Sequence, residues 1–327
     1  MQRRTIAILV LTLAACQSRS SESPKDKKLP EEGDRVPESY LSHSWEALIQ
    51  HTRILKSGQA TQPSASREGK FFVYSSTETG SKSQVFLRAT EGIAPTQLTT
   101  NRGQNLFPRV SPDGKRVAFS SDIAGNFDIY VARVDSPALW LQVTTGPQDD
   151  VAPSWSPDGK KVVYSTKNPN GVWQLIIADV GTGIPTFLGP GMHPDWSPTG
   201  DWIAFQSQPK GDWRSSLWLV RPDGAELQEI AADRHKEWAA LTPRFSPDGK
   251  WIAYATVKRS VESILYGEMG RADDIWVIRY DGQYDTRITE DVSAEWWPSW
   301  GGERVFFVSD RDGFPNIFSV RPKPLVE

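Results

Sequence analysis

The residues best suited to chemistry are tryptophans and acidic side chains that neighbour one another in the sequence. An indole offers a broad apolar face with one N–H donor, and a carboxylate beside it offers hydrogen-bond acceptors. The residues of this kind are Trp173, Trp213, Trp238, Trp296, Trp297, Asp149, Asp150, Glu237 and Glu295. Such a set suits a surface that binds a protein, a peptide or a glycan.

Sequence signatures of catalysis are absent from the chain. There is no Gly-x-Ser-x-Gly elbow, no His-Glu-x-x-His and no glycine-rich phosphate loop before a helix. The single Cys excludes an intramolecular disulfide framework and a multi-cysteine metal cluster, and the 4 His leave little room for a histidine-built metal site. We therefore expect no catalytic residue, no metal and no cofactor.

The only cysteine, Cys16, lies at the end of an export signal. Arg3 and Arg4 form a positive start, an apolar run follows, and Ala14-Ala15 directly precede the cysteine. The pattern resembles a bacterial lipobox, in which the signal is cut before a cysteine that becomes lipidated. The alternative is an ordinary secreted protein with a stray cysteine in its signal. We expect residues 1–15 to be a lipoprotein signal peptide and Cys16 to anchor the chain to a membrane.

Residues 16–44 are rich in Ser, Pro, Lys and Glu and contain almost no apolar side chains. Such a segment cannot bury enough surface to fold, so we expect a flexible tether. Gln17 stands where enterobacterial lipoproteins retained in the inner membrane carry Asp, and this favours the outer membrane, facing the periplasm. The formal net charge of −3 and the lack of a Lys/Arg stripe exclude nucleic acid as a partner.

The rest of the chain, residues 45–327, repeats one unit six times. The clearest copies are Ala152–Lys160 and Thr242–Lys250, which share Pro-x-aromatic-Ser-Pro-Asp-Gly-Lys, and the leading prolines are 63, 108, 153, 194, 243 and 298. Short β-rich runs such as Val162-Val163-Tyr164 follow each turn. This period is typical of a β-propeller whose repeats are four-stranded blades.

The predicted fold is therefore all-β: a six-bladed β-propeller with four-stranded antiparallel blades. The sixth unit lacks an outer strand of its own, whereas residues 52–55 resemble the outer strand of the other units. We expect a strand near residues 48–56 to complete the sixth blade and close the ring, leaving no open sheet edge.

The repeats resemble those of the TolB-type propeller family, over about residues 45–322. Asp128-Ile129-Tyr130, Asp274-Ile275-Trp276 and Asn316-Ile317-Phe318 match a second element of that family's repeat. The resemblance implies an envelope partner such as a peptidoglycan-associated lipoprotein. Only the tether and one strand precede the repeats, so we expect a propeller that lacks the α/β domain of TolB. Similar repeats also occur in peptidases of the prolyl-oligopeptidase type and in oligogalacturonate lyases, which use a histidine-rich metal site.

The propeller topology predicts where the candidate binding residues meet. Loops leading into the innermost strands and loops between second and third strands share one rim, and the tryptophans and acids named above fall in both kinds of loop. His193, placed before a repeat proline near the channel mouth, joins this candidate set. Asp195 and Arg244 follow the leading prolines of neighbouring blades, where a structural ion pair between them is expected.

These expectations favour a non-enzymatic, lipid-anchored module of the bacterial cell envelope. It would bind a protein or a cell-wall glycan through one propeller rim and act as a monomer. The alternative is a hydrolase or lyase that uses carboxylates or a metal in the central channel.

Overall fold

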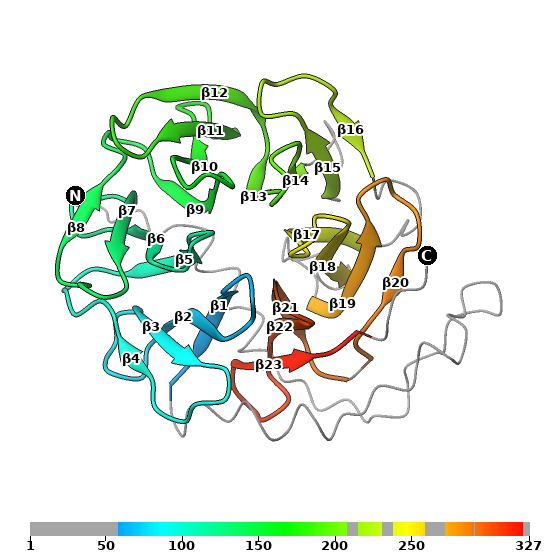
Figure 1. Ribbon diagram of the computed structural model, residues 1–327, viewed down its shortest axis with the longest axis horizontal. Helices are drawn as coiled ribbons and strands as arrows, with labels where there is room; N and C mark the ends of the chain where they lie inside the picture. Colours follow the sequence, from blue (N-terminus) through cyan, green and yellow to red (C-terminus); the bar gives the residue numbers. More distant parts are fainter. Residues whose placement is uncertain (1–57, 208–214, 231–237, 259–271, 291, 323–327) are drawn as a thin grey trace.

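The computed structural model describes residues 58–207, 215–230, 238–258, 272–290 and 292–322. These residues form six antiparallel sheets arranged as blades around a central axis, with the first strand of each blade nearest the axis (Figure 1). The described part of the chain has no helix long and apolar enough to cross a membrane. The predicted all-β, six-bladed propeller is confirmed.

Five blades have four strands each, in sequence order from the axis outwards. The first two blades are β1 (Ala60–Ala65), β2 (Phe71–Ser76), β3 (Gln84–Ala89), β4 (Thr96–Gln97) and β5 (Asn105–Val110), β6 (Arg116–Ser121), β7 (Asp128–Arg133), β8 (Trp140–Gln142). The third and fourth are β9 (Asp150–Trp155), β10 (Lys161–Lys167), β11 (Trp173–Asp179), β12 (Pro185–Pro190) and β13 (Met192–Trp196), β14 (Ile203–Ser207), β15 (Ser216–Val220), β16 (Gln228–Glu229). The fifth is β17 (Trp238–Phe245), β18 (Trp251–Lys258), β19 (Ala272–Arg279), β20 (Thr286–Arg287).

The sixth blade has three strands within the described residues: β21 (Glu295–Gly301), β22 (Arg304–Ser309) and β23 (Asn316–Val320). The strand expected near residues 48–56 lies outside the described residues, so that prediction stays a prediction. Direct contacts nevertheless join the first and last blades. The Ala65 amide donates to Ser299 Oγ at 3.0 Å, and the Gly302 amide donates to the Arg67 carbonyl at 2.9 Å.

The Ser-Pro-Asp-Gly segments form the tight turns between first and second strands. In the third blade the Gly159 amide donates to the Ser156 carbonyl at 2.9 Å, and Ser156 Oγ donates to Asp158 at 2.6 Å. Gly159 has a φ of 66°, which a glycine adopts without steric cost. These hydrogen bonds hold each turn in one conformation.

Each inner strand carries a β-bulge at the residue before its leading proline. These six residues have φ between 52° and 56°, a left-handed conformation that is uncommon for residues other than glycine: Gln62, Phe107, Ala152, His193, Thr242 and Trp297. The pairing register between first and second strands shifts at this point in every blade. A bulge redirects the side chain it carries, so the same position in all six blades is turned differently from a regular strand residue.

Apolar clusters fill the spaces between adjacent blades. Trp155 is 5% exposed and packs with Val131 and Val143 of the second blade. Its indole Nε1 also donates to the Arg109 carbonyl of that blade at 3.0 Å. Trp196, at the same repeat position in the fourth blade, packs against the third. The repeat tryptophans therefore hold neighbouring blades together.

We expect Trp155→Phe to lower the free energy of unfolding by about 2 kcal/mol, because the buried Arg109 carbonyl loses its donor as well as some packing. Trp196→Phe is the matched control, since Trp196 Nε1 reaches its acceptor, Gly200 O, only at 3.5 Å. Its loss should be about half as large. Urea denaturation followed by circular dichroism measures both. Equal losses would show that the Trp155 hydrogen bond contributes nothing of its own.

Candidate functional site

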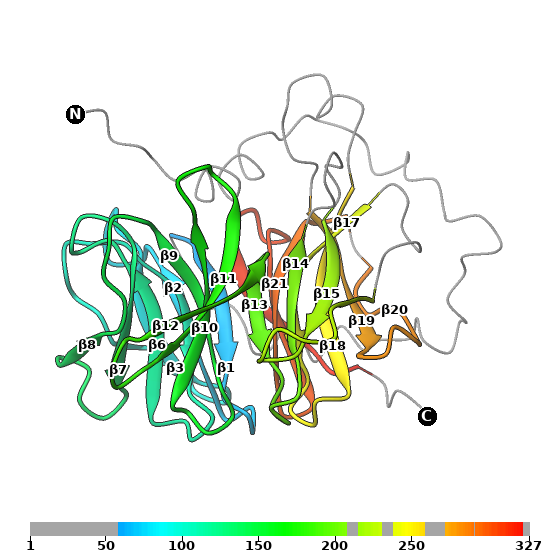
Figure 2. The same cartoon turned by 90° about the horizontal axis from the view of Figure 1, so that it is seen from above.

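The strand registers bring the predicted loops to one edge of the ring. In the third blade, Asp150 at the start of β9 pairs with Thr166, and Lys167 pairs with Trp173 at the start of β11. In the sixth blade, Glu295 at the start of β21 pairs with Ser309 at the end of β22. The starts of the inner strands and the second-to-third-strand links therefore share an edge, which we call the tryptophan rim. Figure 2 shows the ring from its side, with the strands running between the two edges.

Four of the predicted residues are half-buried at the tryptophan rim. Trp173 lies under the Lys167 ammonium, 5.5 Å from the ring centroid, and Trp238 packs edge-on against Trp276 at 6.3 Å. Trp296 follows Glu295, the first residue of β21, and the Asp149 carboxylate accepts a hydrogen bond from the Phe127 amide at 3.0 Å. Parts of the three indoles therefore reach the surface from three different blades.

Two predicted rim acids are buried. Glu295 is 0% exposed and forms a salt bridge with Arg311. Asp150 is 8% exposed, and burial raises its pKa to about 6, against the opposing hydrogen bonds from Thr166 and Thr144. Their carboxylates support the rim from inside. Because both carboxylates are buried, they do not face a partner at the rim surface as the sequence predicts.

Trp297 and His193 also differ from expectation, because the bulge directs them into the channel. They are 7% and 5% exposed, and each packs against the buried Phe107. The three ring centroids lie 5.1–5.7 Å apart. Phe107, His193 and Trp297 come from the second, fourth and sixth blades, so their mutual contact places them at the axis. We call these three residues the aromatic plug.

The remaining predicted residues are not part of the described chain. Cys16, Trp213 and Glu237 fall outside it. Expectations that rest on these residues remain predictions.

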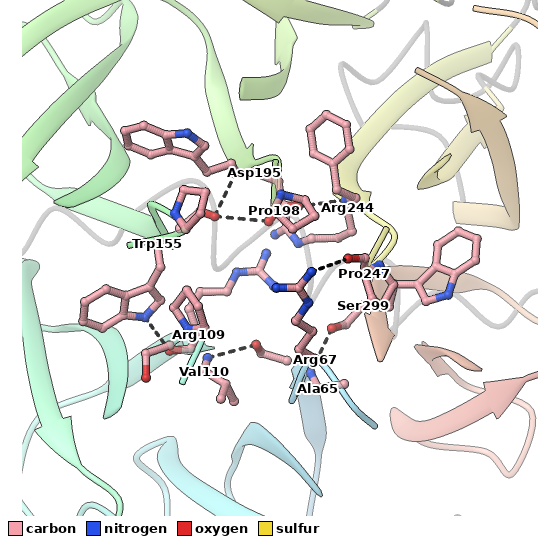
Figure 3. Close-up of a pocket in the computed structure, with 18 of the residues that line it drawn as sticks. Ala65, Arg67, Arg109, Val110, Trp155, Asp195, Pro198, Arg244, Pro247 and Ser299 are labelled. Carbon is pink, nitrogen blue, oxygen red and sulfur yellow. Dashed lines mark hydrogen bonds between the residues drawn. The ribbon is translucent and has the colours of Figure 1, made fainter. Parts of the chain in front are cut away.

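Below the aromatic plug, towards the Pro-Asp-Gly turns, a cavity of about 140 Å³ occupies the channel. Six of its lining residues stand directly after the leading prolines, one from each blade: Ser64, Arg109, Ser154, Asp195, Arg244 and Ser299. We call this set the channel ring. Figure 3 shows the cavity, with Arg67, Arg109 and Arg244 reaching towards its middle from different sides.

The expected ion pair between Asp195 and Arg244 does not form in the structure. Asp195 instead accepts hydrogen bonds from Ser154 Oγ at 3.2 Å and from the Phe245 amide at 2.8 Å. Burial raises the pKa of Asp195 to about 6, against the opposing charge of Arg109. The carboxylate thus connects three neighbouring blades rather than neutralising Arg244.

His193 of the aromatic plug faces an environment that disfavours its cation. Burial lowers its pKa to about 3, and the positive charge of Arg109 acts in the same direction. Its Nδ1 is buried without a hydrogen-bond partner. A neutral imidazole therefore packs between Phe107 and Trp297 at neutral pH.

Two features of the channel bear on the enzyme alternative. Within the described ranges, no group of three or more His, Cys, Asp or Glu side chains is placed to hold a metal ion. The channel carries instead a cationic set, Arg67, Arg109 and Arg244, around one carboxylate. The arrangement suits binding of a negatively charged group.

Comparison with known proteins supports the repeat assignment. The model of the PD40 family, described as the TolB beta propeller domain, matches residues 49–217. The Tol-Pal system protein TolB of Anaeromyxobacter dehalogenans is 29% identical over 134 residues, which are 40% of this chain and 27% of that protein. The chain spans less than a third of the length of the curated relatives it matches.

Solved structures share the architecture at low identity. TolB from Acinetobacter baumannii superimposes with a TM-score of 0.61 at 21% identity, covering 76% of this chain and 59% of that one. An oligogalacturonate lyase in complex with manganese gives a TM-score of 0.55 at 16% identity, covering 80% and 89%. A TolB protein and a lyase thus share this propeller architecture.

Proposed function

Because the chain belongs to the PD40 family of TolB beta propeller domains, we propose that it is a non-enzymatic binding and scaffolding module of the bacterial cell envelope. The lipidated Cys16 would hold it at the outer membrane, facing the periplasm. The tether of residues 16–44 would let the propeller reach a partner. The tryptophan rim would make the contact.

The observation that carries this proposal is the grouping of partly exposed indoles at one rim. Trp173, Trp238 and Trp296 come from the third, fifth and sixth blades, and all three are half-buried. Their packing against the blades fixes their orientation, so binding immobilises few additional rotamers. Rigid aromatic anchors of this kind dominate the energetics of protein interfaces.

The partner class follows from the relatives. One matched relative is a Tol-Pal system protein, which supports an envelope protein, such as a peptidoglycan-associated lipoprotein, as the partner of this chain. A cell-wall glycan would also stack on indoles. Recovery of a protein or of a glycan is the outcome that distinguishes the two.

We expect Trp238→Ala combined with Trp173→Ala to reduce recovery of the partner about tenfold, because each indole is a candidate hot spot. The measurement is chemical crosslinking and pull-down from the native envelope. Phe187→Ala is the matched control, since Phe187 is a 59% exposed aromatic residue on the outer strand β12, away from the rim. Equal recovery with the double variant and with wild type would remove the rim assignment.

The anchor and the enzyme alternative have separate tests. Mass spectrometry of the mature protein should find a lipidated Cys16, and an unmodified cysteine would remove the membrane anchor. A hydrolase or lyase would show a stoichiometric metal or turnover of glycans or esters by the purified protein. Such turnover would replace the binding function proposed here.

A further inference from the structure

The channel ring normally supplies a hydrogen-bond acceptor to the next blade. In four of the six blades, the side chain of the channel-ring residue accepts a hydrogen bond from a backbone amide of the next blade. The donor is the residue that directly follows the next blade's own channel-ring residue. The bonds are Val110 N to Ser64 Oγ at 3.1 Å, Trp196 N to Ser154 Oγ at 3.0 Å, Phe245 N to Asp195 Oδ2 at 2.8 Å and Ala65 N to Ser299 Oγ at 3.0 Å. Serine or aspartate at this position therefore has a structural reason.

Arginine stands at this position in the other two blades. Arg109 belongs to the second blade and Arg244 to the fifth, and these blades face each other across the ring of six, at β5 and β17 in Figure 1. A guanidinium carries donors only and cannot accept the amide of the next blade. The repeat architecture therefore gives no reason for arginine at either position.

Both arginines are buried, and Asp195 acts on Arg109 only through its charge, without a salt bridge. Arg109 is 8% exposed and Arg244 is 5% exposed. Arg244 donates from Nη1 to its neighbouring Pro243 carbonyl at 2.6 Å, while its Nε is buried with no partner. Neither guanidinium forms a salt bridge with another described residue. A buried charge without a salt-bridge partner is destabilising unless a counter-ion offsets it.

The cavity lining carries more positive than negative charge. Arg67, on the turn of the first blade, extends across to the fifth blade and donates to the Pro247 carbonyl at 3.2 Å. Asp195 is the only carboxylate among the lining residues, and both of its oxygens already accept hydrogen bonds within the blade framework. Three guanidinium groups thus converge on one small cavity that holds a single, committed carboxylate.

We propose that Arg109 and Arg244 bind a small oxyanion, a carboxylate or a phosphate group, in the channel cavity. A guanidinium fork matches the planar or tetrahedral array of oxygens in such a group, and two opposed forks hold it from both sides. A cavity of about 140 Å³ admits an ion of this size. The turns carrying Pro112, Pro157, Pro198 and Pro247 line its outer end. The aromatic plug separates it from the tryptophan rim, so this site is independent of the function proposed above.

The test uses inorganic phosphate and succinate, titrated separately into the purified protein in a buffer without either ion. Thermal melting and isothermal calorimetry report binding, because an ion that binds only the folded state raises the melting temperature. Arg109→Ser and Arg244→Ser install the residue that three other blades carry at this position, so folding should be preserved. Each should weaken the affinity of the responding ion at least about tenfold. The ion that binds more tightly identifies the group.

Arg102→Gln is the matched control, because it removes one exposed arginine outside the cavity. It should leave the response to phosphate and succinate unchanged. A response to neither ion in wild type would overturn the proposal. A response that both serine variants retain, or that Arg102→Gln loses equally, would show an adventitious ion only and would also overturn it.

Discussion

Gly69→Ala should lower the free energy of unfolding by about 3–4 kcal/mol, because the contact between the first and last blades has no space for a Cβ. Gly69 has a φ of +71°, and an added Cβ would lie 2.6 Å from the Gly301 carbonyl oxygen of the sixth blade. That oxygen belongs to the backbone and cannot move aside without shifting β21. Urea denaturation followed by tryptophan fluorescence measures the loss.

Gly114→Ala separates the clash from the backbone strain. Gly114 occupies the same repeat position in the second blade with nearly the same φ, +69°, but its Cβ would meet only the Phe71 ring at 3.6 Å. Its substitution should therefore lower the free energy of unfolding by only about 1–2 kcal/mol. The difference between the two variants is the contribution of close contact at the ring closure. Equal losses would mean that this closure tolerates separation of the blades.

The repeat made the propeller predictable from the sequence. Six spaced copies of one turn, each followed by short β-rich runs, define blades whatever the individual residues are. Trp155 and Trp196 could be assigned to the contacts between blades because they recur at one repeat position and are too large to leave exposed. The strand that would complete the sixth blade was predicted from a lone segment, residues 52–55, which lies outside the described residues.

The direction of side chains near the leading prolines was not predictable in the same way. Trp297 and His193 precede a proline and were placed at the rim by their position in the chain. A bulge with φ of 55° at Trp297 and 52° at His193 turns them into the channel instead. Proline restricts the residue before it mostly to extended conformations, so the sequence pattern favours the wrong geometry. The conformation depends on the fit of the whole inner strand.

The channel ring, by contrast, was within reach of the sequence. Asp195 and Arg244 follow leading prolines, and their position in neighbouring blades predicts only an ion pair between them. In a closed ring, one repeat position must face the same direction in every blade. Applied to all six blades, this symmetry predicts a convergent set of side chains at the axis. At the position after the leading proline, four blades carry serine or aspartate, and two opposite blades carry arginine.

The aromatic plug links the stability of the ring to pH through His193. The pKa of the imidazole is lowered from 6.5 to about 3 in the folded protein, mainly by burial and further by Arg109. Below about pH 6.5 the unfolded chain therefore binds a proton that the folded chain excludes. The contribution of His193 to stability is fully present above this pH and is lost as the pH falls towards 3. Asp150 and Asp195, whose pKa values are raised to about 6, change stability in the opposite direction.

We therefore expect His193→Phe to gain about 3 kcal/mol of stability relative to wild type between about pH 7 and about pH 4. Phenylalanine keeps the ring contacts with Phe107 and Trp297, while the effects of the two aspartates are present in both proteins and cancel. Urea denaturation at several pH values measures the difference. Phe107→Leu is the control, since it alters the same plug without a titrating group and should shift stability equally at every pH. A His193→Phe difference that does not change with pH would show that His193 is protonated in the folded protein or accessible to water.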